Sequence, residues 1–257
     1  MATIAGPHRD AASGEERFFR TMAFVMAAVL VAGFGFNAAM GRSSFTASPL
    51  LLHVHAFVFF GWVTLYVTQN LLVAGGNVAL HRRLGWLATF WVPAMVAMGM
   101  WITVWSLQAH GGPPFFDQNE FLVSNPMGLL YFAGMAAAAI RLRRRTDWHR
   151  RLMFSGMAVL TGPGFGRLLP MPFLIPWAWW ISAVGAGLLF IGIGMIADKR
   201  RDGGVHPAWW VAAGVLVAVQ LVADLIAYSP VGVELTRWLL EGTPGAARSM
   251  EAFFPPM

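Results

Sequence analysis

The sequence of 257 residues contains no cysteine. Disulfide bonds, iron–sulfur clusters, thiolate zinc sites and covalently attached haem are therefore excluded, because each of them needs a cysteine sulfur. Any metal ion must be held by histidine, a carboxylate, methionine or a ligand from outside the chain.

Charge is also scarce, since only 12% of the residues are charged and 57% are hydrophobic. An ordinary soluble domain is about a quarter charged and about half apolar. The apolar residues form long blocks, most of them near the roughly 20 residues that a membrane-spanning helix needs. We therefore predict an all-α polytopic membrane bundle of about seven transmembrane helices, at residues 18–40, 50–74, 84–107, 126–140, 152–169, 176–197 and 208–228.

The basic residues lie mostly on one side of this chain. Fourteen of the 18 Lys and Arg residues lie at residues 9–20, around the start of the first apolar block, or in the loops 75–83, 141–151 and 199–207. The positive-inside rule places that side in the cytoplasm, so we expect the N-terminus inside and the C-terminus outside a bacterial inner (plasma) membrane. Because topology accounts for the positive charge, we expect a lipid bilayer with anionic headgroups as partner and no nucleic acid.

We expect three parts in the chain. Residues 1–17 form a cytoplasmic segment, residues 18–228 the seven-helix membrane domain, and residues 229–257 an extracytoplasmic tail with a short surface helix near Leu235–Leu240. The first segment is polar, and the apolar run after it is too long for the core of a cleavable signal peptide. The first span is therefore expected in the mature protein.

A histidine follows each basic loop. The first two loops end in the same motif, His81-Arg82-Arg83-Leu84 and His149-Arg150-Arg151-Leu152, and the third ends in His206. The arginines are expected to bind lipid phosphates at the membrane surface. The histidines are candidate metal or haem ligands, because a helix N-terminus favours the neutral imidazole that binds metal. Otherwise each histidine caps its own loop.

The geometry of this repeat gives a sharper expectation. If three helices begin with histidine at one membrane level, packing brings two or three imidazoles together. We expect His81 and His149 to be the closer pair, with His206 or Gln69 approaching from neighbouring helices.

A second polar group is expected near the opposite membrane face. A charge inside a bilayer costs several kcal/mol unless it is paired or hydrated, so Arg167 and Asp224 are predicted to pair, with His53 or His55 nearby. His53 and His55 point in different directions on a helix, and only one can face the bundle. Gln69 follows 14 residues after His55, on almost the same helical stripe.

Several strings of residues resemble an uncharacterised family of bacterial multi-pass membrane proteins, a domain of unknown function with repeated His-Arg motifs at cytoplasmic helix starts. The strings are His55-Ala56 with Gly61-Trp62, Gln69-Asn70-Leu71, HRRLG at 81–85, DWHRRLM at 147–153 and RLLP at 167–170. The resemblance covers about residues 50–207. In that family Gly usually follows the first histidine, where this chain has Ala56, and His53 has no regular counterpart. The resemblance thus favours His55 and implies no activity.

Three classes of function are considered. The first is a haem b-binding or redox membrane protein, an oxidoreductase whose paired imidazoles hold iron, with Arg167 neutralising propionates. Its ligands are His55 with His53 or His110 near one face, and two of His81, His149 and His206 near the other.

The second class is an enzyme, such as a hydrolase, dependent on zinc or another divalent metal. It would use His81, His149 and His206 with a carboxylate from Asp147, Asp198 or Asp202. The chain lacks the HExxH motif of zinc proteases. The third class is a non-catalytic transport or assembly factor, in which polar residues inside the membrane line a path.

Overall fold

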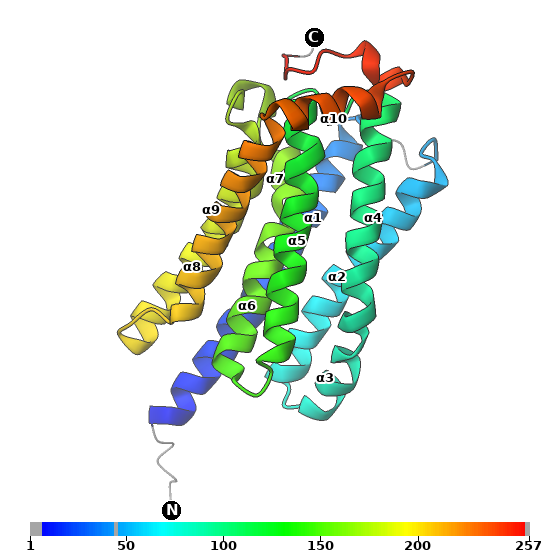
Figure 1. Cartoon of the computed structure of the whole chain (residues 1–257). Coiled ribbons are helices and arrows are strands. Elements are labelled where there is room, and N and C mark those ends of the chain that lie inside the picture. The colour runs from blue at the N-terminus through cyan, green and yellow to red at the C-terminus, as the bar shows by residue number, and fades with distance from the viewer. Residues whose placement is uncertain (1–6, 44–45, 255–257) are drawn as a thin grey trace, which may run out of the picture.

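The computed structural model describes residues 7–43 and 46–254, and these residues form helices without any β-strand (Figure 1). The α-helices are α1 (Pro7–Ala39), α2 (Leu50–Ala74), α3 (Val78–Gly85), α4 (Leu87–His110), α5 (Gln118–Arg141), α6 (Thr146–Val159), α7 (Gly162–Leu168), α8 (Ala186–Asp202), α9 (Pro207–Ala227) and α10 (Pro230–Leu240). Short 3-10 turns lie at Met171–Leu174 and Pro244–Ala247, and a π-helical turn, Trp180–Gly185, leads into α8.

Six helical segments are long and apolar enough to cross a membrane, at residues 14–39, 50–74, 87–110, 118–141, 180–202 and 207–227. They lie side by side in one bundle (Figure 1). Large apolar side chains such as Phe57, Phe90 and Leu225 are exposed on its outside, as expected where lipid replaces water. The expected all-α membrane architecture is confirmed at this level, with six candidate spans.

The two ends of the bundle differ. The turns between α2 and α3, between α5 and α6 and between α8 and α9 lie at one end, which we call the basic end (Figure 1, lower end). α10 and the C-terminal segment cover the other end, which we call the α10 end.

The stretch expected as the fifth span, residues 152–169, is divided into α6 and α7. The break falls at Leu160 and Thr161, just before Gly162-Pro163-Gly164. Pro163 has no backbone N–H and Gly162 has low helix propensity, so the sequence favours a new start here. Neither helix has the length of a span by itself, although α7 continues from α6 towards the α10 end (Figure 1).

Two expected helix starts are also displaced. α5 begins at Gln118, eight residues before the predicted start at Pro126, because its polar first turn is buried and bonded to the C-terminal segment. The span predicted from Leu84 is preceded by a separate short helix, α3, and begins as α4 at Leu87. His81 therefore lies in α3 and does not open a span.

Close packing between α1 and α7 depends on glycine. The backbone of Gly33 lies directly against the carbonyl oxygen of Gly164, and a Cβ on Gly164 would approach the Val29 carbonyl oxygen to 2.9 Å. Small residues allow membrane helices to approach backbone to backbone, which increases their van der Waals contact. This contact fixes α7, and with it Arg167, against α1.

The C-terminal segment closes the α10 end. The guanidinium of Arg248 donates to the carbonyl oxygens of Gly111 and Phe116, and the backbone N–H of Ala252 donates to Asp117. α10 lies across the bundle (Figure 1). The expected surface helix near Leu235–Leu240 is thus confirmed and starts earlier, at Pro230.

Candidate functional sites at the two ends of the bundle

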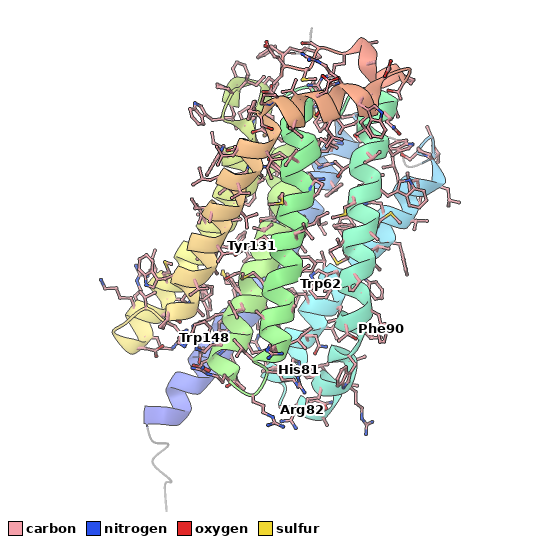
Figure 2. The ribbon with its side chains drawn as sticks, viewed as in Figure 1. Trp62, His81, Arg82, Phe90, Tyr131 and Trp148 are labelled. Carbon is pink, nitrogen blue, oxygen red and sulfur yellow. The ribbon has the colours of Figure 1, made fainter. Side chains whose placement is uncertain are left out.

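The rings of His81 and His149 face one another at the basic end. Their centroids are 6.2 Å apart and their planes are nearly perpendicular, at 83°. His81 comes from α3 and His149 from the first turn of α6, so residues 68 positions apart in the sequence meet here. Figure 2 shows His81 and Arg82 near this end of the bundle. The expected proximity of these two histidines is confirmed.

Gln69 holds His81 from α2. With its amide nitrogen facing α3, Gln69 donates to Nδ1 of His81 (2.6 Å) and to its carbonyl oxygen (3.2 Å), and its amide oxygen accepts from the backbone N–H of Gly85 (3.0 Å). The Gly85 N–H can only donate, so it sets the amide orientation. The neutral His81 ring then carries its proton on Nε2.

His149 is fixed in the opposite tautomer. Its Nδ1 lies 2.8 Å from the carbonyl oxygen of Ala139, which can only accept a hydrogen bond. The proton of the neutral ring is therefore on Nδ1, and Nε2 keeps its lone pair for a ligand or a proton. The pair thus combines one ring that offers an N–H with one that offers a lone pair.

The environment of His81 disfavours its charged form. Burial lowers the pKa of His81 below its usual value of 6.5, and the neighbouring His149 and Arg82 lower it further, while an interaction with the backbone of Gln69 acts in the opposite direction. A neutral imidazole is the form that binds metal or accepts a proton.

His206 does not join this pair. It caps α9 by accepting the Ala208 N–H at Nδ1 (3.1 Å), its Nε2 lies 3.0 Å from Asp147, and its ring contacts Trp148 edge to face. Among the side chains that the structure describes, at residues 14–43 and 46–254, no three of His, Asp or Glu are close enough to hold a metal ion. The expected cluster of His81, His149 and His206 is therefore not formed there.

A buried ionic network lies beside the histidines and was missed in part by the sequence analysis. Arg151 is only 3% exposed and binds Asp198 through two hydrogen bonds of 2.8 Å. Arg201 (2.7 Å) and the indole N–H of Trp209 (2.7 Å) also donate to Asp198. Glu15 binds Arg151 at 2.9 Å.

This network corrects two expectations. Arg151 was expected to bind lipid phosphates, but its burial and its two carboxylate partners keep it inside the bundle. Asp198 was considered as a zinc ligand, but arginine and tryptophan donors occupy its oxygens. The network joins α1, α6, α8 and α9, and the sequence signal for it was a carboxylate, Asp198, directly at the end of an apolar run.

Near the α10 end, Arg167 and Asp224 do not form the expected pair. Asp224 accepts hydrogen bonds from the indole of Trp180 (2.9 Å) and the amide of Gln220 (2.6 Å). Arg167 donates to the Pro163 carbonyl oxygen (2.9 Å), and its guanidinium carbon lies 4.0 Å from the centre of the Phe34 ring. Neutral donors therefore stabilise Asp224, and a π face contacts Arg167.

His55 lies in the same region as Arg167. Its ring packs on Phe59 at 4.4 Å between centroids, and the charge of Arg167 acts on it electrostatically. Nδ1 of His55 and Nε of Arg167 are both buried without a hydrogen-bond partner. The structure thus places His55 and Arg167 together, far along the bundle from Gln69, His81 and His149.

The fold and these sites define a helical protein with the composition of a multi-pass membrane protein. Comparison with known protein families, curated proteins and solved structures gives no match. The resemblance to an uncharacterised membrane family stays a prediction.

Proposed function

We propose that this chain is a membrane redox protein that binds b-type haem through His81 and His149. The observation that carries the proposal is the distance of 6.2 Å between the two ring centres. A metal–nitrogen bond of about 2 Å and about 1 Å from nitrogen to ring centre give about 6 Å for two imidazoles on opposite sides of one metal. The pair therefore has about the spacing that two imidazoles holding one metal would have.

The surrounding residues supply what such ligands need. Ligating histidines usually donate their other N–H to a carbonyl or carboxylate, which is the bond that His149 makes to Ala139. Ligation through Nε2 of His81 would need its proton on Nδ1, so the Gln69 amide would have to turn and give up the hydrogen bond that it accepts from Gly85. Arg82, whose charge acts on His81, would neutralise a propionate in place of Arg167, which lies at the far end.

Space for the macrocycle around the metal would require part of α3 to move aside while His81 keeps its distance from His149. α3 is eight residues long and has no buried residue, so its displacement exposes little core. Bound haem would supply one-electron transfer, and the protein would contribute ligation, charge and exclusion of water.

An optical spectrum tests this proposal. Protein purified in mild detergent after growth with a haem source should show the sharp reduced bands of a six-coordinate b-type haem after dithionite. His149→Gln and His81→Gln should each lose them, whereas His206→Gln should keep them. A wild-type protein without haem absorption would overturn the proposal.

Elemental analysis of the same sample distinguishes the alternatives. Zinc or another divalent metal at about one per chain, lost in His149→Gln, would support the metal-dependent enzyme, with water completing a two-histidine site. Absence of both metal and haem would leave the transport or assembly factor. Neither alternative has a specific contact in its favour that the haem proposal lacks.

The proposed topology has seven crossings, with α6 and α7 together forming the fifth. Their combined path and the basic turns at one end of the bundle support it. The exposed arginines Arg82, Arg83, Arg143 and Arg144 would then contact anionic headgroups at the cytoplasmic face of a bacterial inner membrane.

A further inference from the structure

Arg167 is a cation without an acidic partner inside the apolar part of the molecule. Among the described residues no Asp or Glu lies within ion-pair distance of it, and its one hydrogen bond goes to the Pro163 carbonyl oxygen. The Phe34 ring covers one face of the guanidinium. A guanidinium has five N–H donors, so most of its hydrogen-bonding capacity is unused.

A second unused polar atom lies close by. Nδ1 of His55 is buried without a partner, as is Nε of Arg167. The two side chains lie near one another, because the charge of Arg167 acts directly on the His55 ring. Arg167 packs on Phe34, and His55 packs on Phe59. Buried polar atoms without partners are rare, so two in one place indicate a missing ligand.

The charge of this place determines the ligand. Arg167 keeps its positive charge, and the neutral His55 ring can present its N–H at Nδ1. Donors with a net positive charge and no nearby carboxylate bind an anion. Phosphate suits a guanidinium especially well, because its oxygens match the planar fork of N–H groups.

The depth of Arg167 and His55 in the bundle matches the depth of phospholipid phosphates at a membrane surface. His55 is the sixth residue of α2, roughly 8 Å from its start at 1.5 Å per residue. Arg167 is the residue before the last of α7. Phe57 and Leu168 beside them are exposed, so the place opens towards the lipid side of the bundle.

We propose that Arg167 and His55 bind the phosphate group of a ligand at the leaflet near the α10 end, between Phe34 and Phe59. The phosphate belongs to a phospholipid headgroup or to free phosphate. The site is separate from the His81 and His149 pair, so it stands whether or not haem binds there.

The test measures how phosphate changes the thermal unfolding midpoint and the lipid content of the protein. Wild type, Arg167→Gln and His55→Phe are delipidated in a phosphate-free neutral detergent. Phosphatidylglycerol, whose charge lies on its phosphate, or inorganic phosphate is then added. Arg237→Gln is the matched control, because Arg237 is an exposed arginine on α10 at the same end of the bundle.

Wild type and Arg237→Gln should be stabilised and should retain one phospholipid in native mass spectra. Arg167→Gln should bind about tenfold more weakly or worse, since it loses charge-assisted hydrogen bonds, and His55→Phe should be weakened less. A response to phosphatidylglycerol alone identifies a lipid headgroup, and saturation by inorganic phosphate identifies a free anion.

Equal responses of wild type and Arg167→Gln, or no response of wild type to either compound, would overturn the proposal. If Arg167→Gln does not fold, the phosphate response of wild type is compared with those of His55→Phe and Arg237→Gln, and this comparison tests the site. A wild type that responds no more than its His55→Phe variant then counts against the site.

Discussion

At the scale of single residues, the histidine pair shows how backbone groups choose a tautomer. The Gly85 N–H orients the Gln69 amide, and that amide leaves the His81 proton on Nε2, while the Ala139 carbonyl oxygen keeps the His149 proton on Nδ1. Two identical side chains thus carry their proton on different ring nitrogens. A sequence motif shared by both, His-Arg-Arg-Leu, contains nothing that distinguishes them.

The lowered pKa of His81 predicts a dependence of stability on pH. A base whose pKa is lower in the folded than in the unfolded state binds its proton more weakly when folded, so stability is complete above pH 6.5 and falls as the pH decreases below it. In a plot of the unfolding midpoint against pH, His81→Gln should reduce the slope below pH 6.5. Arg82→Gln should reduce the slope, because Arg82 helps to lower this pKa, and Arg83→Gln is the control. Equal slopes in all four proteins would contradict the assignment.

The buried pair of Arg151 and Asp198 predicts a large loss on removal of one partner. Asp198→Leu leaves the buried Arg151 guanidinium with Glu15 as its remaining carboxylate partner, and breaking a buried ion pair costs about 3–5 kcal/mol. Arg200→Gln, an exposed change on the same helix, should change the free energy of unfolding by less than about 0.5 kcal/mol. Unfolding in denaturing detergent measures both. The double variant with Arg151→Met should cost less than the sum of the single changes.

At the scale of elements, the break between α6 and α7 and the glycine contact with α1 belong together. α6 ends at Val159 and α7 begins again at Gly162, and Gly33 and Gly164 let α7 lie backbone to backbone on α1. The charge of Arg167 is held near the bundle surface by this packing.

Substitutions at two glycines of α1 test the contact. Gly33→Ala would place a methyl group against the backbone of Gly164, so the helices must separate, and we expect a loss of about 1–3 kcal/mol. Gly35→Ala meets nothing within 4 Å, so it should be neutral or stabilising by up to about 1 kcal/mol. The unfolding midpoints of the two variants check this. A tolerated Gly33→Ala would mean that α1 and α7 are not in close contact.

At the scale of the whole molecule, sequence reasoning located the bundle and the meeting of His81 with His149. Long apolar runs indicate membrane spans directly. A motif repeated at equivalent turns indicates that its residues lie at the same depth in the membrane. The sequence did not predict the partners of Arg167 and Asp224. Packing decides how each helix is rotated about its axis, and so which aromatic ring or indole N–H lies beside each charge. Sequence reasoning also placed the start of α5 too late, because the polar residues Gln118 and Asn119 find partners only in the folded chain.

The proposed orientation gives a prediction at the same scale. Reporter fusions after Arg145 and after Met257 should report opposite sides of the membrane, the first cytoplasmic, because an odd number of crossings separates them. A fusion after Ala39 should report the side opposite to Arg145. The same side for Arg145 and Met257 would mean that α6 and α7 do not complete a crossing.

The C-terminal segment has a consequence for the order in which the protein is made. Gln118, at the start of α5, donates to the carbonyl oxygen of Gly245, 127 residues further along the chain, and its own backbone N–H donates to Met250. During synthesis α5 is therefore delivered to the membrane long before these partners leave the ribosome. The polar first turn of α5 must therefore stay at the membrane surface, hydrogen-bonded to water. It is buried only after the segment that follows α10 has been synthesised and has packed against it.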